Sequence, residues 1–250
     1  GTASFTMSLL DEGTQSLGAL EMADRAESLG ADLSAGSSLD YSYGSLSALE
    51  DKLDPSLELL ADVLRNPSFP AGEIERVRKE WIASIAREKT LPEALAARLL
   101  PPLIYGSGHP YGIPFTGSGT EASIAALTRD DLVAFQRDWL RPDNATLVVV
   151  GDTTAAEVLP LLEKHFGAWQ PPAAPRPAKA LPPAAAVTAP RIFLVDKPGA
   201  IQSNILLGIA TPSSEAPNRL ELDTMNDVIA GTFTSRINMN LREDKHWSYG

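Results

Sequence analysis

The chain has 250 residues, 44% of them hydrophobic, and a formal net charge of −11, which is the composition of a soluble globular protein. This acidic balance argues against a nucleic-acid-binding protein, because phosphates attract Lys and Arg. The absence of Cys excludes disulfides and thiolate metal sites, and no apolar run reaches the roughly 18 residues of a membrane-spanning helix.

Apolar residues recur at helical spacing through most of the first 169 residues. We expect Gly30 to end the first helix, and Thr128 with Asp131 resembles a capping box. Helices are predicted over Asp11–Gly30, from Asp54 through Leu64, and over Ala71–Lys89, Pro92–Leu103, Thr128–Trp139 and Ala155–Phe166. Strands are predicted over Asp32–Leu46, where apolar or aromatic residues alternate with small polar ones, and over Ala145–Val150.

Residues 170–190 are almost all Pro and Ala, which favours an extended, semi-stiff linker over a packed core. Beyond it we expect strands at Arg191–Val195 and Ser203–Ala210 and a helix over about 218–229. Helices and strands mix without regular βαβ alternation, so the predicted fold class is α+β.

Residues 1–14 read Gly-x-Ala-x-Phe-x-x-x-x-Leu-x-x-Gly-Thr, which resembles the opening of the M16 family of zinc metallopeptidases. Further segments match that family's pattern in order and spacing. They are Phe69-Pro70, His109-Pro110-Tyr111-Gly112, Leu127 to Leu132, Arg141 to Asn144, Leu147 to Asp152, His165 to Trp169, Asp196 to Ser203, Gly231 to Arg236 and Leu241-Arg242-Glu243. The resemblance implies tandem domains, each an antiparallel sheet with helices on one face. It places a first domain at 1–169, the linker at 170–190 and the start of a second domain at 191–250.

Active members of the family carry an inverted His-x-x-Glu-His motif in this opening segment. The corresponding positions here are Ser4, Met7 and Ser8, and the third ligand, a Glu in the family, falls on Ser84. A neutral hydroxyl binds Zn²⁺ poorly, and a thioether cannot take a proton from water. We therefore expect no zinc and no hydrolysis from this chain by itself.

The resemblance also carries an Arg and a Tyr, here Arg242 and Tyr249, which in the family project from the second domain toward the zinc site. A guanidinium can bind peptide carbonyls, and a phenol can stabilise the oxyanion formed when water attacks. The alternative is a surface Arg paired with a carboxylate and a Tyr packed at a strand edge.

Other chemistry-bearing residues favour structural interpretations. His109, His165 and His246 are not paired with other ligands at metal-binding spacing, and Asp11, Glu12 and Asp40 are given no site role. The Gly-rich stretches at 106–108 and 117–119 lack the Lys-Ser or Lys-Thr of a phosphate loop.

The resemblance implies a non-catalytic module of an M16 peptidase. Such a module would help to enclose peptide substrate, and it would supply Arg242 and Tyr249 to a zinc-bearing partner, a separate subunit or another part of the same polypeptide. The alternative is a scaffold or assembly protein that kept the fold without handling peptides. Compared with the family, the chain is expected to lack the first strands and to stop inside the second domain, and a periplasmic location is expected.

Overall fold

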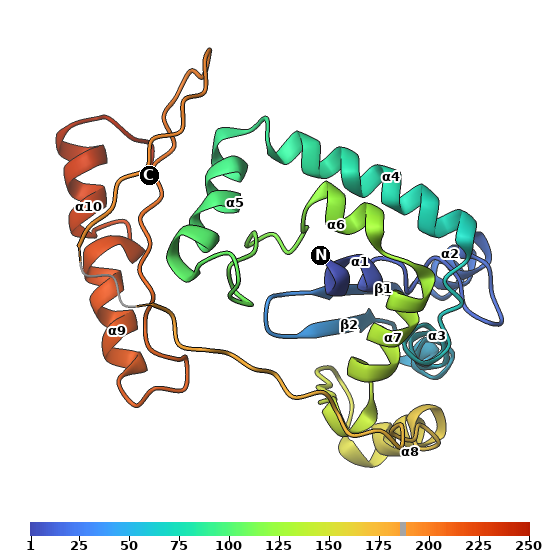
Figure 1. The fold of residues 1–250 in the computed structure, drawn as a ribbon. Coiled ribbons are helices and arrows are strands. Elements are labelled where there is room, and N and C mark those ends of the chain that lie inside the picture. Colours follow the sequence, from blue (N-terminus) through green and yellow to red (C-terminus); the bar gives the residue numbers. More distant parts are fainter. Residues whose placement is uncertain (186–188) are drawn as a thin grey trace. The chain divides into compact units, whose positions relative to one another are not determined.

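The computed structural model describes residues 1–185 and 189–250, and their contacts divide the chain into two compact units, Gly1–Gly208 and Ile209–Gly250 (Figure 1). The expected linker at 170–190 includes residues 186–188, which lie outside the described residues. The domain division after residues 169 and 190 stays a prediction, since the contacts group residues up to Gly208 with the first unit.

The first unit is mostly helical. Its α-helices are α1 (Thr2–Met7), α2 (Ala19–Leu29), α3 (Leu53–Arg65), α4 (Ala71–Glu88), α5 (Pro92–Tyr105), α6 (Glu121–Ala126), α7 (Arg129–Trp139) and α8 (Ala155–Phe166), with 3-10 turns at Glu50–Lys52 and Pro142–Asn144. Local signals set several ends: Gly30 closes α2 at a φ of 62°, and Thr128 and Asp131 form the expected capping box of α7.

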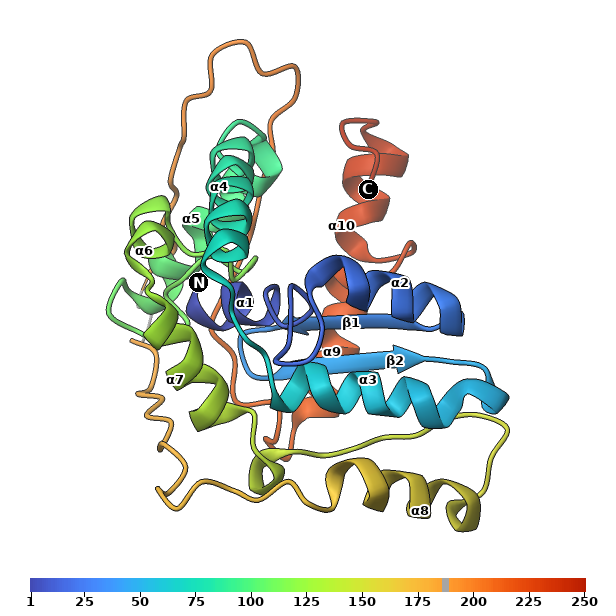
Figure 2. The same cartoon turned by 90° about the vertical axis from the view of Figure 1, so that its right-hand side faces the viewer.

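One antiparallel hairpin, β1 (Asp32–Ser37) with β2 (Ser42–Ser47), is the sheet of the described residues. Leu33 and Ala35 pack against the core, whereas Ser34 and Ser45, which face each other across the hairpin, are exposed. Figure 2 shows the strands beside α2 and α3, and α1, α2 and α3 contact them. The expected α+β class, an antiparallel sheet with helices on one face, is confirmed.

The core gathers apolar side chains from α1 to α4, the segments that flank them, and α6 and α7. Its fully or nearly fully buried members are Phe5, Met7, Leu9, Leu10, Met22, Leu59, Val63, Phe69, Ile74, Val77, Ile85, Ile124 and Leu132. Burying side chains of this size stabilises a fold by roughly 1.5–3 kcal/mol each. Because Phe5, Met7, Leu9 and Leu10 all belong to this core, the opening segment is a structural centre of the first unit.

The second unit is helical and has little core. It contains α9 (Arg219–Asn226), a π-helical turn at Asp227–Gly231, α10 (Arg236–Asn238) and a second π-helical turn at Met239–Asp244. The helix predicted over about 218–229 is therefore present, although its second half is wound more widely than an α-helix.

Three predicted strands are wrong. The segments 145–150, 191–195 and 203–210 form neither strands nor helices, and many of their apolar side chains are exposed, including Val148, Val150 and Ile192. Their composition favours burial in a sheet, but a strand requires a neighbouring backbone to complete its hydrogen bonds. Among the described residues, β1 and β2 are the strands that pair in this way, and the other pairings are isolated bridges at Gly13–Gly18 and Thr14–Pro67.

Two further boundaries differ from the prediction. The helix expected over 11–30 begins only at Ala19, because Thr14 Oγ1 accepts hydrogen bonds from the N–H groups of Ser16 and Leu17 and stabilises a turn there. The single strand expected over 32–46 is a hairpin, since Ser38 and Tyr41 close a tight turn at its middle. In the described part of the chain, no helix has both the length and the apolar character required to cross a membrane.

Candidate functional site

The opening helix uses the residues at the degenerate metal positions for its own structure. Met7 is fully buried in the core, and Ser8 closes α1 and donates its hydroxyl to the carbonyl of Phe5 at 2.9 Å. Ser4 is half-buried, and its Oγ lies so close to Gly117 that a Cβ there would approach it to 2.7 Å. The Gly117 backbone thus lies directly against the Ser4 hydroxyl.

Helix α4 packs against α1 through aromatic contacts. The Trp81 ring meets Phe5 edge-on at 5.7 Å between centroids, and the Arg78 guanidinium lies 5.7 Å from the centroid of the same Phe5 ring. Ser84 stands one turn beyond Trp81 on α4, and it is exposed. The structure therefore joins the two helices that carry Ser4, Ser8 and Ser84, but it joins them through Phe5 and Trp81.

The donors present do not fit a zinc ion. Ser4, Ser8 and Ser84 offer neutral hydroxyls where imidazole or carboxylate would be needed, and the thioether of Met7 is enclosed by apolar side chains. Among residues 1–185 and 189–250, no group of three or more His, Asp or Glu side chains could hold a metal ion. We derive no hydrolytic step from this segment.

A buried ion pair at the end of α4 was not anticipated from the sequence. Arg98 on α5 is only 7% exposed, and its guanidinium contacts Glu88, Ser118 Oγ at 2.7 Å and the Gly119 carbonyl at 2.6 Å. Trp81 Nε1 donates to the Ser118 carbonyl at 2.9 Å. This network fastens the 116–119 loop to α4 and α5, and it therefore holds Gly117 against Ser4. An Arg and a Glu ten residues apart carry no local sequence signal for such a pairing.

In the second unit the structure brings Arg242 and Tyr249 together. The Arg242 guanidinium carbon lies 5.1 Å from the centroid of the Tyr249 ring and 4.9 Å from that of Phe233. The chain turns back after the last π-helical turn, where the Trp247 N–H donates to the Leu241 carbonyl at 2.8 Å. Tyr249 is 91% exposed, so its hydroxyl is open to solvent. Phe233, the second aromatic partner, was not singled out in the sequence.

Each of the three histidines has a structural partner. His109 contacts the carbonyl of Pro182 at 2.7 Å, His165 Nε2 lies 2.7 Å from Asp54 Oδ1, and His246 Nδ1 lies 3.0 Å from the Arg242 carbonyl. Asp40 accepts a short hydrogen bond from the Tyr111 hydroxyl, and this contact raises the pKa of Tyr111.

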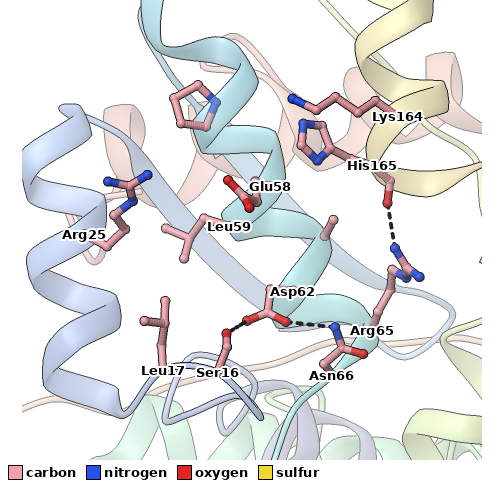
Figure 3. A pocket seen from close by; sticks show the side chains of 12 residues that line it. Ser16, Leu17, Arg25, Glu58, Leu59, Asp62, Arg65, Asn66, Lys164 and His165 are labelled. Carbon is pink, nitrogen blue, oxygen red and sulfur yellow. Dashed lines mark hydrogen bonds between the residues drawn. The ribbon is translucent and has the colours of Figure 1, made fainter.

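A pocket of about 430 Å³ opens between α2, α3 and α8 (Figure 3). Most of its polar lining is already paired: Ser16 and Asn66 donate to Asp62 at 2.6 and 2.8 Å, and Arg65 donates to the His165 carbonyl at 2.7 Å. The lining contains both cations and anions, namely Arg25, Arg65 and Lys164 with Glu58 and Asp62, so the pocket does not offer a surface of one charge to a ligand.

Two carboxyl groups beside this pocket, those of Asp54 and Asp62, have lowered pKa values. Hydrogen bonds from Lys164 and then His165 lower the pKa of Asp54. For Asp62, burial raises the pKa, but hydrogen bonds from Ser16, Thr14 and Asn66 outweigh it and the net shift is downward. Asp54 thereby ties α8 to α3.

Two family models match the chain along nearly its whole length. The model described as Insulinase (Peptidase family M16) matches residues 1–105, and the model described as Peptidase M16 inactive domain matches residues 126–250, half of the chain. The chain belongs to the M16 peptidase family. The resemblance of the opening segment and its later landmarks is thus confirmed.

Curated M16 relatives include an uncharacterized zinc protease of Mycobacterium leprae, which is 25% identical over 253 residues covering all of this chain and 55% of the relative. The chain therefore spans about half the length of the curated relatives it matches across its full length.

Solved structures agree on the fold. The M16 inactive domain from Pseudomonas fluorescens has a TM-score of 0.80 and 26% identity, with 100% of this chain and 60% of that one covered. The periplasmic protease PqqL of Escherichia coli has a TM-score of 0.64 at 20% identity, with 73% and 20% covered, and it supports the fold alone.

Proposed function

We propose that this chain is a non-catalytic module of an M16 zinc peptidase. In this proposal it helps to enclose and bind peptide substrate and supplies Arg242 and Tyr249 to a zinc-bearing partner module. The observation that carries the proposal is a contrast within one chain: Met7 is packed into the core and the Ser8 hydroxyl bonds to backbone, whereas Arg242 and Tyr249 lie together with the phenol exposed.

The chemistry of the pair suits this role. The cation–π contact with Tyr249 and Phe233 orients the Arg242 guanidinium, which carries several N–H donors for peptide carbonyls. A phenol hydroxyl beside a fixed positive charge is a suitable donor to a developing oxyanion. A zinc ion, supplied by the partner module, would activate the attacking water.

The hairpin offers a means of holding peptide. A two-stranded sheet leaves backbone N–H and C=O groups unpaired along its outer edges, and an extended peptide can add to such an edge as a further strand. The exposed face of β1 and β2 carries small hydroxyl side chains such as Ser34 and Ser45, which would tolerate many peptide sequences.

The test combines metal analysis with reconstitution. The purified chain should contain less than about 0.1 zinc per molecule and show no cleavage of an unfolded peptide. Mixing it with an M16 chain encoded beside it that carries an intact His-x-x-Glu-His should produce cleavage that neither protein shows alone. About one zinc per chain, or cleavage by the zinc-bearing chain that is indifferent to this one, would contradict the proposal.

A scaffold role is the second candidate, and the exposed apolar segments favour it. Val148, Val150, Ile192 and Leu194 are at least three-quarters exposed, as surfaces buried in an assembly would be when alone. A stable complex with the partner that leaves peptide cleavage unchanged would favour this candidate over the first.

We also propose a periplasmic location, supported by the Pro- and Ala-rich linker. Fractionation of cells expressing the full-length protein tests it, because recovery with cytoplasmic markers would contradict it.

A further inference from the structure

The proline-rich segment 171–185 lies against the first unit through several specific contacts. In Figure 2 it runs as an extended trace from α8 past α7. Its prolines are Pro171, Pro172, Pro175, Pro177, Pro182 and Pro183. A proline has no backbone N–H, so such a segment presents mainly carbonyl acceptors to its surroundings. A surface that binds it must therefore supply donors.

Arg141, directly after α7, supplies donors at one end. It is only 4% exposed, and its guanidinium donates to the Ala174 carbonyl at 3.1 Å and to the Pro172 carbonyl at 3.4 Å. Asp143 fixes the orientation of this guanidinium through hydrogen bonds of 2.5 and 2.8 Å. Orienting a buried charge in advance lowers the entropy lost on binding the segment.

His109 supplies a donor at the other end. The Tyr111 N–H donates to His109 Nδ1 at 3.0 Å, so Nδ1 acts as an acceptor and the ring proton resides on Nε2. Nε2 then donates to the Pro182 carbonyl at 2.7 Å. Tyr105 stacks on the His109 ring at 5.0 Å and holds it in place.

Between these ends the segment contributes its own cations. Arg176 donates to Asn144 Oδ1 at 2.5 Å, and Lys179 Nζ lies 5.7 Å from the centroid of the Trp139 ring. The same Lys179 Nζ donates to the Asp40 carbonyl at 2.7 Å. Asp40 lies in the turn that joins β1 to β2, so the segment touches the hairpin at its turn.

We propose that residues 171–185 are a strap that docks on the surface formed by Trp139, Arg141, Asn144 and His109 and fixes the hairpin turn 38–41. Carbonyls of the segment are bound at both ends and its two cations make contacts between them, so the contacts span it from Pro172 to Pro182. The Tyr111 hydroxyl holds Asp40 through its carboxylate while Lys179 holds it through its carbonyl, so the turn is fixed twice.

Trypsin provides a direct test in the full chain. It cleaves after Lys179 but not after Arg176, which precedes Pro177. Because cleavage follows the population of the released strap, the Lys179–Ala180 bond should be cut at least about tenfold more slowly in the folded chain than in a synthetic peptide of residues 171–185. Equal rates would overturn the proposal.

Two variants separate docking from general stability. Arg176→Ala and Trp139→Leu should each raise the rate at Lys179–Ala180 by about fivefold, whereas the rate at Arg191–Ile192 should stay unchanged. Arg137→Ala, which removes an exposed arginine from α7 paired with Asp138, is the matched control and should alter neither rate. Unchanged cleavage at Lys179 in Arg176→Ala would also overturn the proposal. Because Arg176 is exposed, this variant keeps the test valid if Trp139→Leu folds poorly.

Hydrogen exchange tests the effect on the turn. The Ser38 N–H donates to the Tyr41 carbonyl at 2.8 Å, and its exchange should be about threefold faster in Arg176→Ala than in the parent chain. Unchanged exchange there would show that the strap does not fix the hairpin. The measurement uses no peptide and no partner, so its outcome is distinct from that of the proposed function.

Discussion

The side chains of the candidate site residues near Ser4 and those near Arg242 differ in their burial and contacts. In the first, Met7 is fully buried and the Ser8 hydroxyl bonds to the backbone of its own helix. In the second, the Arg242 guanidinium rests between two aromatic rings and Tyr249 is 91% exposed. In the first segment the Met7 thioether and the Ser8 hydroxyl serve packing and helix structure, whereas in the second the Tyr249 phenol is open to solvent and the Arg242 guanidinium also lies 3.4 Å from the Glu243 carboxylate.

The largest expected effect comes from a substitution in the Arg98–Glu88 network beside Ser4. Arg98→Ala leaves the Glu88 carboxylate, only 18% exposed, without its cation, so the free energy of unfolding should fall by about 4 kcal/mol. Denaturant unfolding measures this. Lys89→Ala removes a more exposed ion pair with Glu121 near the same loop, and it should change the free energy of unfolding by less than about 1 kcal/mol. Equal effects would mean that the Arg98 network does not hold the loop.

Met7→Ala should destabilise the first unit by about 3 kcal/mol, because it leaves a cavity in the core. Ser84→Ala, at the third degenerate position but exposed, should change stability by less than about 0.5 kcal/mol. Thermal and denaturant unfolding of both variants make the comparison. A neutral Met7→Ala variant would show that this position does not serve packing.

Tyr249→Phe should lower partner-dependent peptide cleavage by about 100-fold, equivalent to about 2.7 kcal/mol, with unchanged melting temperature. Arg242→Ala should act mainly by raising KM, since its guanidinium is proposed to hold peptide carbonyls. Ser214→Ala removes another exposed hydroxyl of the second unit and is the control. Full activity of Tyr249→Phe would remove this residue from the proposed site.

The smallest expected effect is on the loss of folding stability at acidic pH. The pKa of Asp54 lies below its ordinary value of 3.8, so the folded chain binds this proton more weakly than the unfolded chain does. The contact of Asp54 with Lys164 and His165 therefore stabilises the fold fully at pH values above the ordinary pKa of Asp54. This stabilisation is lost as the pH falls through the lowered pKa of the folded chain. Asp54→Asn should flatten this part of the stability–pH curve, whereas Gln15→Ala, which removes an exposed side chain that does not titrate, should leave it unchanged. An unaltered acid slope in Asp54→Asn would contradict the assignment.

The sequence predicted helices better than strands, for a reason visible in particular segments. Helix α8 was predicted within its observed bounds, and Thr128 with Asp131 marked the start of α7, because a helix is completed by contacts within about four residues. The apolar run at 145–150 gave the same strength of signal for a strand, yet a strand depends on a partner that the run itself does not contain.

By itself the sequence determined that hydroxyls and a thioether stand at Ser4, Ser8, Ser84 and Met7, and this fixes the chemistry that these positions can offer. Only the tertiary structure decided that Met7 is core, that Arg98 pairs with Glu88, that Phe233 joins Arg242, and that Lys179 reaches Asp40 across 139 residues of chain. Residue type is local information, whereas burial and pairing depend on groups that are remote along the chain and meet only when it folds.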